Sequence, residues 1–124
     1  SFPTKLREIL GAEFYLCMGH DDHYIAVYSP EEFEIYQTKL NSIPGKAGSV
    51  VRRKLLSCTD RQVPDKQGRI LISPILKEHA CLEKDVVVIG SSNHAEIWDQ
   101  KLWDDFNGSV SIDDISDAIS QITL

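Results

Sequence analysis

A short basic turn holds the side chains best suited to bind an anion. Asp65-Lys66-Gln67-Gly68-Arg69 follows a proline and leads into an apolar run at residues 70–72. Gly68 permits a positive φ, and the Asp65 carboxylate can bond the backbone two residues on or clamp Arg69. An exposed guanidinium oriented in this way suits a phosphate, or the O6 and N7 edge of guanine. By itself, such a pentapeptide more often forms a β-turn closed by an Asp–Arg pair and nothing more.

Two histidines beside an acidic pair suggest a metal site. His20-Asp21-Asp22-His23 follows Gly19, and this composition favours a turn over a helix that would align the two rings. The spacing places no third ligand near them. We therefore expect neither a metal nor a cofactor in this protein.

A cysteine nucleophile is the second chemical alternative. Cys58 has His79 and His94 elsewhere in the chain, but no nucleophile elbow or oxyanion loop surrounds any of them. The GKAGS segment at 45–49 lacks the glycine and lysine spacing of a phosphate-binding loop. We expect no enzyme, with a small hydrolase that uses Cys58 or the His20/His23 pair as the alternative.

The composition is that of one folded domain in a reducing compartment. A chain of 124 residues with 42% apolar residues can bury its own core. Cys17, Cys58 and Cys81 are far apart and form no C-x-x-C pair, which favours buried thiols. There is no run of about 18 apolar residues and no visible signal peptide, so we expect no membrane partner.

Basic charge collects in the middle of an acidic chain. Residues 42–77 carry eight Lys or Arg and two Asp or Glu, whereas the whole chain has a net charge of −6. The acidic total argues against polyanion binding by the whole surface. One basic face remains compatible with this charge, as does an ordinary solvated helix face.

Two similar series of elements must position these side chains. In the first half, an apolar run at 15–18 predicts a buried strand, the turn at 19–22 leads to a second strand, and Ser29-Pro30-Glu31-Glu32 predicts a capped helix that stops at residues 42–45. A second helix is expected at 46–58. In the second half, a strand at 70–72 leads into a short Pro-containing helix, and a β-branched strand at 86–89 is joined by a turn at 90–93 to another strand.

The C-terminal segment predicts one more helix. Residues 111–122 begin at the capping residue Ser111 and carry an apolar stripe of Ile112, Ile115, Ala118, Ile119 and Ile122.

The order of elements repeats along the chain. Residues 1–8 align with 71–78, and Leu6, Arg7 and Glu8 then match Leu76, Lys77 and Glu78. The same offset places residues 27–33 on 97–103. Nothing before Ser1 matches the DKQGRI segment, so we expect an N-terminus that has lost a strand and its turn. We predict that residues 1–33 and 71–103 superpose.

Several of these segments together resemble the MraZ family of bacterial transcription regulators, in the SpoVT/AbrB-like group. The second half carries the likeness in DKQGRILI, LEKDVVVIG and HAEIWDQKLW, and the first half in PTKLRE, YIAVYSPEEF and VVRRKLLS. Three departures stand out. Ser73 takes the place of the first of two prolines, Lys77 replaces an arginine, and the first D-x-x-G-R turn is absent.

The resemblance implies an α+β fold of duplicated swapped-hairpin, AbrB-like β-barrel units with peripheral helices. A MraZ-like domain at 1–110 would contain repeats at about 1–41 and 59–108, joined by the helix at 46–58, with residues 111–124 as a C-terminal helix. The family forms ring-shaped homo-oligomers. They bind direct repeats in double-stranded DNA upstream of the division and cell-wall operon, usually as repressors, in the cytoplasm on the nucleoid.

The resemblance also implies which side chains touch DNA. The turn would present Asp65, Lys66, Gln67 and Arg69, and the nearby cations Lys5, Arg7, Arg52 and Arg53 would complete the contact set. One turn per subunit, repeated around a ring, would give an acidic protein a multivalent contact. The alternative is an oligomeric protein-binding or antitoxin-like module that does not bind DNA in this form.

Overall fold

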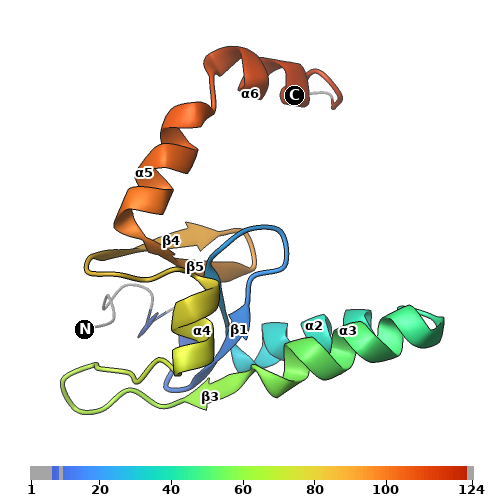
Figure 1. Ribbon diagram of the computed structural model, residues 1–124, viewed down its shortest axis with the longest axis vertical. Coiled ribbons are helices and arrows are strands. Elements are labelled where there is room, and N and C mark those ends of the chain that lie inside the picture. Colours follow the sequence, from blue (N-terminus) through green and yellow to red (C-terminus); the bar gives the residue numbers. More distant parts are fainter. Residues whose placement is uncertain (1–6, 9, 123–124) are drawn as a thin grey trace.

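A five-stranded antiparallel sheet joins the two halves of the chain (Figure 1). The computed structural model describes residues 7–8 and 10–122. Its strands lie in the order β3-β1-β2-β5-β4, and their bounds are β1 Phe14–Met18, β2 Ile25–Tyr28, β3 Asp60–Gln62, β4 Val86–Ser91 and β5 His94–Asp99. The helices are α2 Pro30–Asn41, α3 Gly45–Ser57, α4 Pro74–His79, α5 Gln100–Ser109 and α6 Ile112–Ile119. The α+β class is as predicted.

Two hairpins form most of the sheet and meet through their inner strands. The β1–β2 hairpin joins the β4–β5 hairpin where Ile25 pairs with Ile97 and Val27 with Ala95. A capped helix follows each hairpin, because Ser29 accepts from the amide of Glu32 and Asp99 from that of Leu102. These two caps match in the proposed alignment of the halves. The arrangement is compatible with a duplication, while superposition of the halves as swapped-hairpin units stays a prediction.

The core occupies both faces of this sheet, because neighbouring residues of a strand point to opposite faces. Leu16, Ile25 and Val27 lie on one face, packed in one cluster with Leu76 of α4 and Ala80, which follows that helix. Cys17, Ala26 and Tyr28 lie on the other, against an aromatic layer. That layer contains stacked pairs of Tyr15 with Phe33, Tyr28 with Tyr36 and Tyr24 with Trp98. The double coverage explains why β2 is buried along its whole length.

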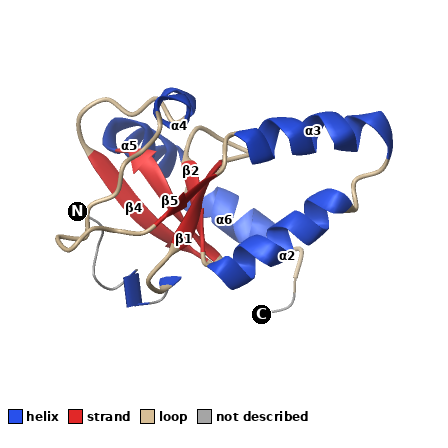
Figure 2. Cartoon of the chain, turned by 90° about the horizontal axis from the view of Figure 1, so that it is seen from below, coloured by secondary structure: helices blue, strands red, loops and turns tan. Residues whose placement is uncertain are grey.

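The helices project from this core in two directions. Figure 2 shows α2 and α3 as an antiparallel pair on one side of the sheet. Figure 1 shows α5 leaving the sheet at β5 and carrying α6 away from it. No helix in the described part of the chain is long and apolar enough to cross a membrane.

The strand predicted at residues 70–72 was wrong, and two other local details differ from the sequence analysis. Residues 70–72 form no strand, because no backbone in the described residues pairs with them, although Ile70 and Ile72 still pack on the core. The polar segment β3 does form a strand, because it pairs with β1. The turn expected at 90–93 narrows to Ser92 and Asn93, since β4 pairs with β5 through Ser91.

The cysteines are partly as expected. All three are free thiols, and Cys17 and Cys58 are buried, but Cys81 is exposed. Burial raises the pKa of Cys17 to about 12. Cys81 follows α4 at a positive φ of 53°, on the connection that leads toward β4, and this places it outside the core.

Candidate nucleic-acid interface

The Asp65–Arg69 turn is a closed network of hydrogen bonds. The Gly68 amide donates to the Asp65 carbonyl at 2.9 Å, and the Asp65 amide donates to the Arg69 carbonyl at 3.0 Å. Gly68 has a φ of 76°, in the left-handed region that glycine adopts without a steric penalty. The turn predicted from the sequence is thereby confirmed.

The Asp65 carboxylate organises the whole turn. One oxygen accepts from the backbone amides of Gln67 and Arg69, both at 2.9 Å, and the other accepts from Nε of Arg69 at 2.8 Å. The bond from the Arg69 amide is the main reason that the pKa of Asp65 lies below its usual value, followed by the side-chain bond from Arg69. Asp65 therefore stays charged and holds Arg69 at neutral pH.

The Arg69 guanidinium is held in place yet open to solvent. Its Nη2 also donates to Oε1 of Gln67 at 3.1 Å, and the side chain is 66% exposed. Nη1 has no partner among the described residues. An arginine fixed on one edge and free on the other can donate to a ligand without first losing much side-chain entropy.

Both legs of the turn are anchored to the core. The incoming leg continues β3, which pairs with β1 and is tied to it by an ion pair between Arg61 and Glu13. On the outgoing leg, the carbonyl of Leu71 accepts from the Gln62 side chain at 2.8 Å, which joins the two legs. The turn consequently stands at a fixed place at the lower left of Figure 1.

One further predicted contact residue lies beside the turn. Arg7 lines an open hollow of about 700 Å³ together with Asp65 and Lys66, which is exposed. Lys5 lies outside the described residues. Glu8 and Asp65 line the same hollow, so Arg7 and Lys66 place two cations beside the turn among two carboxylates.

The two predicted arginines of α3 do not join that surface. Nη1 of Arg52 donates to the carbonyls of Leu40 and Ile43, both at 3.0 Å, so this guanidinium closes the turn between α2 and α3. Arg53 is exposed on α3, which runs away from the turn (Figure 1). The predicted set of cations is thus split between two regions.

Comparisons with known proteins decide the family. A family model described as "MraZ protein, putative antitoxin-like" matches residues 55–120. A protein named Transcriptional regulator MraZ from Thermoanaerobacter sp. (strain X514) is 38% identical over 98% of this chain and 87% of its own length. The chain belongs to the MraZ family. Relatives of the same name from Acetivibrio thermocellus and Leifsonia xyli are 39% and 37% identical, over 98% and 84% of this chain and 87% and 73% of their own lengths.

The alternative chemical sites receive no support from the geometry of this MraZ chain. In the described residues, no three His, Cys, Asp or Glu side chains gather to hold a metal ion. The ring of His23 bonds the carbonyl of His79 and packs against its ring, while the neighbouring Asp22 carboxylate accepts from the His23 backbone amide. Cys58 is buried and its Sγ lies 3.7 Å from the hydroxyl of Ser57, in the core rather than in an open cleft.

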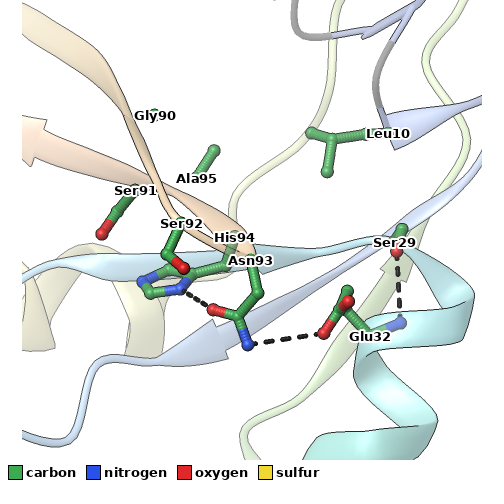
Figure 3. A pocket seen from close by; sticks show the side chains of 9 residues that line it. All are labelled: Leu10, Ser29, Glu32, Gly90, Ser91, Ser92, Asn93, His94 and Ala95. Atoms are coloured by element: carbon green, nitrogen blue, oxygen red, sulfur yellow. Dashed lines mark hydrogen bonds between the residues drawn. The ribbon is translucent and has the colours of Figure 1, made fainter.

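A hollow of about 410 Å³ lies beside the β4–β5 turn of this MraZ chain, where polar side chains connect that turn to the start of α2. Figure 3 shows the Asn93 amide between the ring of His94 and the carboxylate of Glu32. Asn93 bonds His94 at 2.9 Å and Glu32 at 3.4 Å, while Ser29 caps α2. The Ser29 hydroxyl and the Asn93 amide are thus engaged in bonds that hold the β4–β5 turn against the start of α2.

The sequence analysis did not identify one residue that holds the turn of this MraZ chain in place. Gln62 fixes the outgoing leg, but it lies in a polar segment that has no apolar alternation and was not predicted as a strand. The usable signal was local charge, because Glu13, just before β1, bonds Arg61, which pairs with Tyr15 in the middle of β3.

Proposed function

We propose that this protein is a DNA-binding transcription regulator that contacts DNA through the Asp65–Arg69 turn. The main observation in support is the orientation of the Arg69 guanidinium, which Asp65 and Gln67 hold in place while leaving it largely exposed. Membership of a family whose relatives are named transcriptional regulators supports the same conclusion.

The turn can supply both kinds of DNA contact. The free edge of Arg69 carries two parallel N–H donors, which match the O6 and N7 acceptors of guanine in the major groove. Lys66, and Arg7 beside it, are placed to contact phosphates and to fix the register. Gln67 and Asp65 act mainly by holding Arg69.

Assembly would explain how a single basic turn can bind DNA although the whole chain has a net negative charge. A homo-oligomeric ring presents one turn per subunit, so that several weak contacts act together on repeated sites. We propose that these sites are the direct repeats upstream of the division and cell-wall gene cluster, with repression as the outcome. This function places the protein on the nucleoid in the cytoplasm.

The direct test is a binding titration with DNA from upstream of the protein's own operon and a scrambled duplex of equal length. Replacement of Arg69 by alanine should weaken operator binding by about 1–3 kcal/mol and reduce the preference over the scrambled duplex. Arg53→Ala is the matched control and should change affinity little. Equal affinity of wild type and Arg69→Ala for the operator would refute the proposal.

The second candidate is a protein-binding, antitoxin-like module. The description of the family model favours it, as does the strongly acidic surface of the C-terminal region. A preparation that assembles but binds neither duplex at low salt would support this candidate over DNA binding.

A further inference from the structure

The C-terminal helix presents an apolar stripe that the rest of its own chain leaves uncovered. All described residues of α6 are exposed, and Ile112 and Ile122 are exposed by 77% and 63%. Ile112, Ile115, Ile119 and Ile122 follow the spacing of one helix face. An eight-residue helix is marginal in water without packing, so this stripe needs a partner surface.

The charge of α6 restricts what that surface can be. Asp113, Asp114 and Asp117 make the helix acidic, and no Lys or Arg follows Lys101 in the sequence. A hydrogen bond from the Ser111 amide lowers the pKa of Asp114, so it stays charged at neutral pH. Pairing of two α6 helices would bring like charges together, whereas a basic apolar groove would complement both stripe and charge.

A groove with these properties lies along α2. It has a volume of about 340 Å³, and its apolar wall is formed by Tyr28, Ile35, Tyr36, Leu40 and Ile43. Ile35 is 45% exposed and therefore offers apolar surface at the mouth of this groove. We call this feature the α2 groove.

The α2 groove has one lysine among its lining residues. It is Lys39, and all the lining residues belong to the described part of the chain and include no carboxylate. Arg52 donates to the carbonyls of Leu40 and Ile43, and both of these residues line the groove. This guanidinium offsets the negative end of the α2 helix, which would otherwise repel an acidic ligand.

We propose that α6 of one copy docks its isoleucine stripe into the α2 groove of a second copy. The two surfaces differ, so the contact is heterologous and repeats head to tail until a ring closes. Within one copy, α5 holds α6 away from α2 (Figure 1). The inference deepens the proposed assembly by naming its surfaces, and it does not depend on DNA binding.

The test is the mass of the full chain in solution without DNA, measured by light scattering at tens of micromolar protein. The wild type should form a closed oligomer. A stripe variant, Ile115→Asp with Ile119→Asp, and a groove variant, Ile35→Asp, should each fall to the 14.0 kDa monomer. Val63→Asp is the control, since Val63 is equally exposed at 58% but belongs to neither surface.

Mixing the two variants separates head-to-tail contact from every other arrangement. The intact groove of the stripe variant should accept the intact α6 of the groove variant, which gives a dimer of twice the monomer mass and no larger species. This rescue also shows that both variants are folded. A monomeric wild type, a stripe variant that still assembles, or a mixture that stays monomeric would each overturn the proposal.

The outcome is independent of the proposed function. A chain that assembles in this way but ignores operator DNA would refute DNA binding and keep the docking surface. A chain that binds DNA through Arg69 but remains monomeric would support DNA binding and refute the docking surface.

Discussion

The turn at Asp65–Arg69 and helix α3 both carry basic side chains, but their arginines have different partners and different exposure. In the turn, Asp65 and Gln67 hold one edge of Arg69 and leave the rest exposed. In α3, Arg52 is half-buried and bonds two carbonyls, while Arg53 is exposed and no other described residue orients its side chain. The number of cations therefore does not predict the role, and of these two regions only the turn combines exposure with a fixed guanidinium geometry.

The comparison also explains why net charge was a poor guide to the DNA-binding surface. Residues 42–77 form one basic stretch in the sequence, but the fold places its two ends on different sides of β3 (Figure 1). Local orientation, rather than the count of cations, distinguishes a binding site from a solvated helix face.

The largest expected effect concerns stability. Replacement of Arg52 by alanine removes two charge-assisted hydrogen bonds that join α2 to α3, and it should lower the free energy of unfolding by about 2 kcal/mol. Urea denaturation measures this loss. Arg53→Ala is the control and should leave stability within about 0.5 kcal/mol of wild type. If both variants unfold alike, Arg52 has no special structural role.

A smaller effect is expected on DNA affinity when Asp65 is changed. Asp65→Ala removes the carboxylate, and with it both hydrogen bonds by which that carboxylate orients Arg69. It should weaken operator binding several-fold. Asp65→Asn keeps an oxygen for the amides of Gln67 and Arg69, so its loss should be smaller. The titration used for Arg69→Ala provides the measurement. An alanine variant that binds as well as wild type would show that Arg69 needs no orientation.

Much of this architecture could be predicted from local signals. Ser29 and Ser111 both cap their helices as expected, since a cap depends on residues within one turn. The buried strands were marked by their apolar runs. β3 was missed because its polar sequence becomes a strand only by pairing with β1. The strand expected at 70–72 does not form for the opposite reason. Its sequence is apolar, but no backbone among the described residues lies beside it to pair with.

The candidate site was predictable only in part. The turn follows from Asp65, Gly68 and Arg69 alone, because its bonds span four residues. The role of Arg52 could not be predicted, because its acceptors lie nine and twelve residues away on a turn whose geometry depends on helix packing. The sequence likewise placed an apolar stripe on α6 without indicating that the chain would leave it uncovered.

The smallest expected effect is on the pH dependence of stability. The folded state lowers the pKa of Asp65 below its usual 3.8, so Asp65 stabilises the fold at pH values above 3.8, and this contribution is lost as the pH falls through the lowered pKa. The difference in unfolding free energy between neutral pH and about pH 3 should therefore shrink in Asp65→Asn. Urea titrations at the two pH values test this, and an unchanged difference would contradict the role of Asp65.

Lysine footprinting on the unmodified protein compares the two basic regions most directly. Lys66 in the turn and Lys46 and Lys54 on α3 are all exposed, so a lysine-acetylating reagent should label all three in the free protein. Labelling is repeated with operator DNA and with a scrambled duplex, and the sites are read by mass spectrometry. Operator DNA should protect Lys66 and leave Lys46 and Lys54 as reactive as before. Protection of the α3 lysines with Lys66 still fully labelled would contradict DNA binding through the turn.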